Sequence, residues 1–260
     1  MKKFLTVLLL FIVSTSIALG DGLKKIEILG GWEKSDGSIV YGLKISLNEG
    51  WKTYWHTPGP FGFKPQFDFE GSLNISNLNV LWPSPKIFGS SSFETIGYEN
   101  EVILPIAIKA EVDSDPINLK IKGSIGICYD VCMPIEFEAQ SGLKIISKEI
   151  NTDLLAALAN LPLSPSDLGK KNARCSITFS PTGFKIGADI PYLEKASSSI
   201  FFSIMDYRSE LSIEQPKLYN PGKTLYAVGE WRDKTNLKIN SDLITITQLD
   251  EGRVIEQKGC

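Results

Sequence analysis

Alternating apolar and polar residues run through most of the chain and predict β-strands. In Ile39–Leu47, every second residue from Tyr41 onward is large and apolar, which is typical of a strand with one buried face. Other strands are predicted in segments rich in β-branched or aromatic residues: Lys24–Leu29, Trp51–His56, Val102–Lys109, Ile117–Ile127, Ser176–Phe179, Phe184–Ile190, Ser199–Ile204, Leu225–Gly229 and Leu243–Thr247. Turn-forming residues separate them about every ten positions, which favours β-sandwiches.

One segment departs from this pattern. The sequence Asn151-Thr152-Asp153 precedes an Ala/Leu-rich run, Leu154–Ala159, and predicts a short capped helix. A connector rich in proline and serine, Leu161–Asp167, follows it and is typical of a domain boundary. We therefore predict an all-β protein with two β-sandwich domains, at residues 21–148 and 170–258, joined by a short helix and linker at 149–169.

The N-terminus has the pattern of a bacterial export signal. Lys2 and Lys3 precede an apolar run, Phe4–Val13, and small residues lead to Gly20, after which cleavage is expected. The apolar run is shorter than the roughly 20 residues of a membrane-spanning helix. An uncleaved anchor is the alternative. We expect residues 1–20 to be removed and the mature protein to be periplasmic and not membrane-spanning.

The charge balance argues against two classes of partner. The whole chain has 27 basic and 30 acidic residues. Removal of residues 1–20 takes away Lys2 and Lys3 and no acidic residue, which leaves 25 basic residues and a net charge of −5. No basic cluster is present, so neither a nucleic-acid partner nor an anionic lipid surface is indicated.

The four cysteines are Cys128, Cys132, Cys175 and Cys260. In an exported protein an even number suggests disulfides, with three possible connectivities. A Cys128–Cys132 bond closes about five residues and would stabilise by only about 2 kcal/mol in the chain-entropy model. A Cys175–Cys260 bond would close about 86 residues and contribute about 4.6 kcal/mol. The short pair is therefore poor as a staple and suited to thiol–disulfide exchange, although a purely structural short bond is an alternative.

Metal binding, acid–base catalysis and haem attachment are less favoured by the sequence than disulfide exchange. A zinc site is one alternative, because zinc accepts cysteine and histidine ligands. Its ligands would be Cys128, Cys132, Cys175 and the single histidine, His56. An oxidising compartment, however, favours disulfides over the thiolates that zinc needs. His56 lies in an aromatic strand, where a packing role is commoner than that of a catalytic base. The pair also lacks the spacing and the histidine of a haem-attachment motif. No metal and no cofactor are predicted.

Several spaced motifs together resemble a known family. They are Trp51–Phe69, Val80–Pro85, Ile96–Tyr98, Val102–Pro105 and Cys128–Pro134. Over about 120 residues they resemble the amino-terminal periplasmic domain of DsbD/ScsB-type thiol:disulfide interchange proteins. The resemblance implies immunoglobulin-like sandwiches and a cysteine pair that carries electrons from a membrane-embedded module to periplasmic proteins. It also implies a link to processes such as cytochrome c maturation or copper tolerance.

The resemblance assigns the exchange chemistry to Cys128 and Cys132. The full reductases continue into a multi-helix membrane domain and a thioredoxin-like domain, whereas this sequence stops at Cys260. The expected partners are therefore a separate membrane-embedded disulfide reductase and periplasmic thiol or disulfide proteins. The three residues between the two cysteines fit the ScsB-like branch of the family. Residues from about 170 onward weakly resemble the further β-domain of that branch. The sequence does not indicate which cysteine attacks.

Three further expectations concern the surroundings of the cysteines. Tyr129, Tyr98 and the Phe61/Phe63 loop are candidate aromatic shields of the pair, with ordinary packing in the sandwich as the alternative for each. No Lys or Arg lies within three residues of either cysteine. Cys175–Cys260 is expected to be a structural staple that holds down a charged tail at residues 251–259; a free thiol or an intermolecular link at Cys260 is the alternative. The competing hypothesis is a disulfide-stapled protein-binding or chaperone-like module, or a carbohydrate-binding face formed by aromatic residues: Trp51, Tyr54, Trp55 and Phe61.

Overall fold

The structure, a computed structural model, describes residues 22–59, 62–89, 94–141, 150–180, 183–190, 199–204, 211–213, 217–218, 224–231, 240–250 and 253–260. Within these ranges the fold is all-β, as predicted, with one α-helix and two short 3-10 helices, Ser166–Leu168 and Ser241–Leu243. The predicted export signal, residues 1–20, lies outside the described ranges.

The N-terminal part of the chain forms two antiparallel sheets. Their strands are β1 (Leu23–Glu33), β2 (Ile39–Leu47), β3 (Lys52–Tyr54), β4 (Gln66–Asp68), β5 (Asn77–Val80), β6 (Lys86–Phe88), β7 (Thr95–Glu99), β8 (Glu101–Lys109), β9 (Lys120–Cys128) and β10 (Cys132–Gln140). One sheet has the order β1-β2-β8-β5; the other has the order β10-β9-β3-β7-β6, with β4 also paired to β9. Sequence analysis missed β10, although apolar and polar residues alternate along it.

The core of this part lies between the two sheets. As the alternation predicted, Tyr41, Leu43, Ile45 and Leu47 of β2 are all buried in it. Strands β8 and β9 supply matching residues, among them Leu104 and Ile125, from the two sheets. Burial of these side chains is the main stabilising contribution, at about 1.5–3 kcal/mol for each large apolar group.

The other face of β2 is covered by helix α1 (Thr152–Ala159). Asn151 caps the helix by accepting a hydrogen bond from the Leu154 amide, as the sequence indicated. Leu154 is fully buried and fills the space above Gly42, where a Cβ atom would lie 3.0 Å from its Cδ1. Val40, Trp32 and Ile103 complete this second, smaller cluster.

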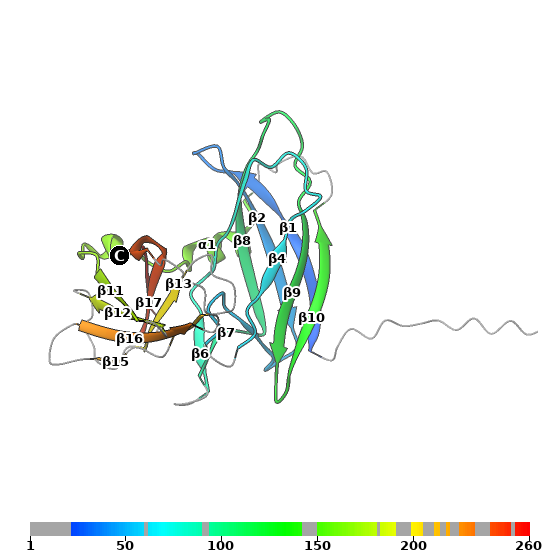
Figure 1. The fold of residues 1–260 in the computed structure, drawn as a ribbon. Coiled ribbons are helices and arrows are strands. Elements are labelled where there is room, and N and C mark those ends of the chain that lie inside the picture. The colour runs from blue at the N-terminus through cyan, green and yellow to red at the C-terminus, as the bar shows by residue number, and fades with distance from the viewer. Residues whose placement is uncertain are drawn as a thin grey trace, which may run out of the picture.

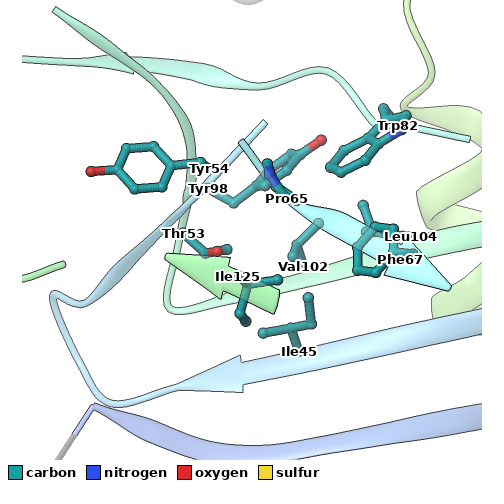
Figure 2. A pocket seen from close by; sticks show the side chains of 10 residues that line it. All are labelled: Ile45, Thr53, Tyr54, Pro65, Phe67, Trp82, Tyr98, Val102, Leu104 and Ile125. Atoms are coloured by element: carbon teal, nitrogen blue, oxygen red, sulfur yellow. The ribbon is translucent and has the colours of Figure 1, made fainter. Parts of the chain in front are cut away.

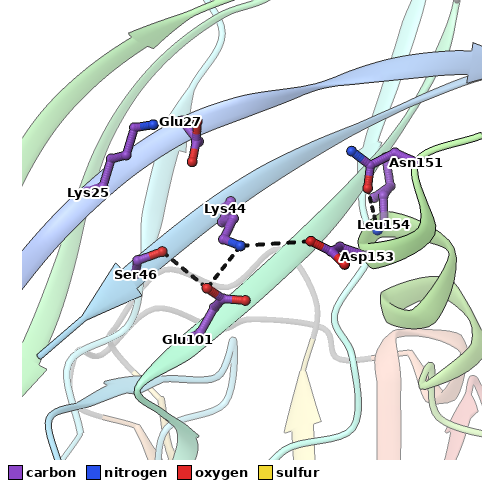
Figure 3. A network of polar contacts seen from close by, with 8 residues as sticks. All are labelled: Lys25, Glu27, Lys44, Ser46, Glu101, Asn151, Asp153 and Leu154. Carbon is purple, nitrogen blue, oxygen red and sulfur yellow. Dashed lines mark hydrogen bonds and ion pairs between the residues drawn. The ribbon is translucent and has the colours of Figure 1, made fainter. Parts of the chain in front are cut away.

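A charged network holds the start of α1 to the sheet (Figure 3). Lys44 Nζ lies 3.0 Å from the Glu101 carboxylate and 4.0 Å from that of Asp153, in the first helical turn. The hydrogen bond to Glu101 is the main reason why the pKa of Lys44 is raised above its ordinary value. Asp153 also lies where a negative charge is favoured by the helix dipole.

The C-terminal part forms two further sheets. Their strands are β11 (Arg174–Ser180), β12 (Gly183–Asp189), β13 (Ser199–Ile204), β14 (Leu211–Ile213), β15 (Lys217–Leu218), β16 (Thr224–Trp231), β17 (Ile244–Asp250) and β18 (Arg253–Lys258). One sheet has the order β11-β12-β16-β14, with β15 paired to β16, and the other has the order β13-β17-β18. A separate core of mostly aliphatic residues, including Ile186 and Ile246, belongs to them.

The two parts lie side by side, with α1 between them (Figure 1). They also interlock: Leu249 and Val254, from the β17–β18 hairpin, belong to the core cluster of the N-terminal sheets. Leu163, in the linker, forms a parallel bridge with Ile255 of β18. Residues 253–258 of the segment expected to be a charged tail held by a disulfide form strand β18, in which Val254 and Ile255 are buried and paired with β17.

Candidate functional site

Cys128 and Cys132 face each other across the β9–β10 hairpin. They are cross-strand partners, separated by the three-residue loop Tyr129-Asp130-Val131, and their Cα atoms are 4.1 Å apart. Directly opposed residues of an antiparallel pair bring their side chains close together. The two sulfurs are bonded, as predicted, and this bond is called the hairpin disulfide below.

The two cysteine residues differ in exposure. Cys128 is 8% exposed, whereas Cys132 is an exposed residue at the start of β10. The loop beside Cys132 is open as well: Tyr129 is 58% exposed and Val131 71% exposed. An incoming thiolate must reach a sulfur along the axis of the bond that it breaks, so access favours attack at Cys132.

Tyr54, at the end of β3, brings a hydroxyl group to the hairpin disulfide. Its oxygen lies 2.8 Å from Cys128 Sγ and 3.1 Å from Cys132 Sγ. Because bonded sulfurs carry no proton, the tyrosine is the donor. Burial raises the pKa of Tyr54 above its ordinary value, so the phenol keeps its proton, and with it this hydrogen bond, at neutral pH.

Strand register explains why Tyr54 reaches the sulfurs. It lies between β7 and β9, directly opposite Gly97 in one strand and facing Gly126 in the other. At Gly126 a Cβ atom would lie 2.8 Å from Cε2 of the Tyr54 ring and 2.6 Å from Cβ of Phe63. The absence of a side chain at this position therefore leaves space for the tyrosine ring to lie across β9 toward Cys128.

A lysine faces the pair from the same strand as Tyr54. Lys52 is the cross-strand partner of Cys128, and its Nζ lies 4.0 Å from Glu99 and 5.3 Å from the centroid of the Phe88 ring. Sequence analysis found no basic residue near the cysteines because it considered only neighbours along the chain. Neither Lys52 nor Tyr54 was singled out as part of the site, and only the β3–β9 register identifies them.

The aromatic residues predicted as shields differ in their distance from the hairpin disulfide and in their burial. Tyr129 packs on Trp51, with ring centroids 6.0 Å apart, beside the disulfide loop, and Phe63 lies over Gly126. Phe61 lies outside the described residues. Tyr98 is not a shield: it is buried, and its hydroxyl donates to the Pro83 carbonyl on the core side of the sheet.

Figure 2 shows Tyr54 and Tyr98 pointing in opposite directions from neighbouring strands. The residues around them, which include Val102 and Leu104, enclose no room for a molecule the size of water. This region is therefore packed core. Of the aromatic residues considered for a carbohydrate-binding face, Trp55 is fully buried and Tyr54 is only 6% exposed, so neither of these two can offer its ring to a sugar.

The remaining two cysteines form the second disulfide, Cys175–Cys260, with Cα atoms 5.2 Å apart. It joins β11 to the residue that follows β18 by two positions. Both cysteines pack against the core of the C-terminal sheets. The bond expected from the sequence is thus present, at a place where it links the first and last strands of that part.

No group of three possible metal ligands occurs among the described residues. Three of the four residues weighed for zinc are held in disulfides, because Cys175 pairs with Cys260 and Cys128 with Cys132. His56 contacts Thr57 and Glu256. In the part of the chain that the structure describes, no helix has the length and apolar character needed to cross a bilayer.

Comparisons with known proteins agree on the class of domain. A family model, described as the N-terminal domain of thiol:disulfide interchange protein DsbD, matches residues 31–142. The crystal structure of the N-terminal periplasmic domain of ScsB from Proteus mirabilis matches 87% of this chain and 90% of its own, with 22% identity and a TM-score of 0.56. At that identity it shows a shared fold. A comparison with curated proteins gave no match. Residues 31–142, which include the hairpin disulfide, are therefore similar to the N-terminal domain of the thiol:disulfide interchange protein DsbD, as the sequence motifs indicated.

Proposed function

We propose that this protein is a periplasmic thiol–disulfide exchange component. It relays reducing equivalents between a membrane-embedded disulfide reductase and periplasmic thiol or disulfide proteins, through Cys128 and Cys132. The observation that carries the proposal is the asymmetry of the hairpin disulfide: an exposed cysteine is bonded to a buried one whose sulfur accepts the shorter of the two phenol hydrogen bonds. A staple does not require either feature.

The exchange follows from this asymmetry. A partner thiolate attacks Cys132 Sγ, the Cys132–Cys128 bond breaks, and its electron pair leaves on Cys128 as a thiolate. The Tyr54 hydroxyl, 2.8 Å from that sulfur, stabilises the new charge. A second partner cysteine then attacks the mixed disulfide; the partner becomes a disulfide and Cys132 leaves as a thiolate. Two electrons have passed from the partner dithiol to the protein.

The reverse sequence passes the two electrons on. The Cys132 thiolate of the reduced protein attacks a partner disulfide and forms a mixed disulfide. The Cys128 thiolate resolves it by attacking Cys132 Sγ, which restores the hairpin disulfide and releases a reduced partner. All atoms and electrons come from the two pairs of cysteines, so the chemistry of this chain needs no cofactor.

The organisation of the chain fits this function. We propose two immunoglobulin-like domains, residues 21–148 and 170–258, joined by the helix and linker at 149–169. The first has both sheets that support the hairpin disulfide. We also propose export to the periplasm with removal of residues 1–20, on the strength of the N-terminal sequence pattern and the likeness to a periplasmic domain.

A trapping experiment with two single variants tests the proposal. Cys128→Ser leaves the exposed Cys132 thiol, and Cys132→Ser leaves the buried Cys128 thiol. With oxidised glutathione as the probe, we expect the first variant to form a mixed disulfide at least about tenfold faster, because access controls the rate. The mass increase of the intact protein reports the adduct. Adducts at neither cysteine would favour the alternative of a stapled binding module, and faster reaction at Cys128 would contradict the mechanism.

A further inference from the structure

The β17–β18 hairpin brings the C-terminal sheets against the core of the N-terminal sheets. Its residue Val254 is buried in the N-terminal core cluster. Leu163 bonds the main chain of β18 on both sides of Ile255: its amide donates to the Val254 carbonyl, with an N–O distance of 3.0 Å, and its carbonyl accepts from the Glu256 amide at 2.8 Å. The main chain of β18 is therefore fixed on both sides of Ile255, and the side chain of Glu256 is held at the junction of the two parts.

The Glu256 carboxylate meets residues of the N-terminal sheets. Its Oε2 lies 3.4 Å from His56 Nε2 and is buried without a hydrogen-bond partner, so the approach of the two side chains is electrostatic; the side chain as a whole is only 12% exposed. Its other oxygen, Oε1, lies 3.9 Å from Lys258 Nζ, on its own strand. Burial, and after it the charge of Glu256, raise the pKa of Tyr98.

His56 is held in turn by its neighbours. Its ring lies against Trp82 in an edge arrangement, with centroids 5.5 Å apart, and its Nδ1 is 2.9 Å from the Thr57 hydroxyl. Its Nε2 is the atom left to face Glu256. Among the described residues, Glu256 is the group from the C-terminal sheets with a recorded polar contact to this ring.

Only one residue separates His56 from Tyr54, and that residue is fixed. Trp55 is fully buried, and its amide donates to the Ile96 carbonyl with a distance of 2.9 Å. Strand β3 is only three residues long and ends at Tyr54. The rings of Trp55 and His56 also contact each other, with centroids 3.7 Å apart, so these two residues connect the Glu256 contact to the end of β3.

We propose that Glu256 is a positioning residue for the exchange site: through its contact with His56 it holds the end of β3 so that the Tyr54 hydroxyl stays on Cys128 Sγ. The C-terminal sheets thereby set the redox equilibrium of a disulfide carried by the N-terminal sheets. This inference rests on the proposed function. It predicts that loss of the carboxylate weakens the Tyr54 hydrogen bond and disfavours the reduced form of the hairpin disulfide.

Glu256→Gln tests this, because it keeps the size of the side chain and removes its charge. The protein is equilibrated with mixtures of reduced and oxidised glutathione, alkylated, and the reduced fraction of the hairpin disulfide is measured by mass. We expect the equilibrium constant for reduction to fall about threefold to tenfold. Asp189→Asn removes an exposed carboxylate that pairs with Arg174 in the C-terminal sheets and should leave the constant unchanged.

The decisive arm combines the change with loss of the tyrosine hydroxyl. If Glu256 acts through Tyr54, Glu256→Gln has no further effect in a Tyr54→Phe background. An equal shift in both backgrounds, or no shift in either, overturns the inference while wild-type exchange upholds the proposed function. A wild-type disulfide that does not equilibrate with glutathione overturns both. His56→Gln provides a second variant and is expected to behave like Glu256→Gln.

Discussion

Removal of the Tyr54 hydroxyl should make the hairpin disulfide harder to reduce. In Tyr54→Phe the ring remains over Gly126 but the hydrogen bonds of 2.8 and 3.1 Å to the two sulfurs are lost. The disulfide sulfurs are weak acceptors, whereas the Cys128 thiolate formed on reduction is a strong one. The substitution therefore destabilises the reduced protein more than the oxidised protein.

The size of the effect follows from the charge of the acceptor. A hydrogen bond to a charged group contributes about 1.5–3 kcal/mol. For a two-electron couple about 1.4 kcal/mol corresponds to 30 mV, so the reduction potential should become more negative by about 30–60 mV. The difference should be largest at alkaline pH, where the thiolate predominates, and should shrink in acid, where the reduced cysteine is a neutral thiol.

Equilibration with glutathione buffers, followed by alkylation and mass measurement, gives the potential. Tyr129→Phe is the matched control, because it removes a hydroxyl from an exposed ring of the same hairpin; we expect it to leave the potential unchanged. A Tyr54→Phe potential equal to that of the wild type, or a less negative one, would refute the assigned role of this hydroxyl.

Three other predictions address the supports of the site. Gly126→Ala should move the Tyr54 ring, which the new Cβ would meet at 2.8 Å, and should shift the potential in the same direction as Tyr54→Phe; an unchanged potential would contradict this. Replacement of both cysteines of the second disulfide by Ser should lower the melting temperature, with a loss of up to about 4.6 kcal/mol, and leave exchange at the hairpin disulfide intact; a double variant that melts like the wild type would refute the staple. Burial holds the pKa of Tyr98 well above its ordinary value, so the folded state keeps a proton that the unfolded chain loses above about pH 10, and stability should fall as pH rises. In urea unfolding, Tyr98→Phe should lose less stability between neutral and alkaline pH than the wild type, and an equal loss would refute the assignment.

The sequence predicted elements whose pattern is local. Ile39–Leu47 was predicted with the bounds of β2, because the alternation of its residues needs no knowledge of partners. The helix after Asn151 was predicted because capping is likewise a property of a few neighbouring residues. The cysteine pair belongs to the same class, since a spacing of four residues brings two side chains together in a hairpin.

What the sequence did not show depends on pairing between distant segments. Tyr54 and Cys128 are 74 residues apart, and only the register of β3 against β9 makes them neighbours. Residues of β18 were interpreted as a charged tail because charged residues such as Glu256 and Lys258 are frequent in this segment. In the structure, Val254 is buried in the core of the N-terminal sheets and Ile255 in that of the C-terminal sheets. Tyr98 was a candidate shield because it is aromatic, but its side chain is buried in the core, which matches the alternative of ordinary packing.

A redox titration of the hairpin disulfide in the intact protein tests the central claim most directly. The purified protein is equilibrated across glutathione ratios, and Cys128 and Cys132 are assayed separately from the second disulfide by peptide mass after alkylation. Structural disulfides of exported proteins have potentials below about −300 mV, and exchange pairs lie higher. We predict reversible reduction of Cys128 and Cys132 within the glutathione range, with the second disulfide unchanged. A hairpin disulfide that stays oxidised at every ratio would contradict the account.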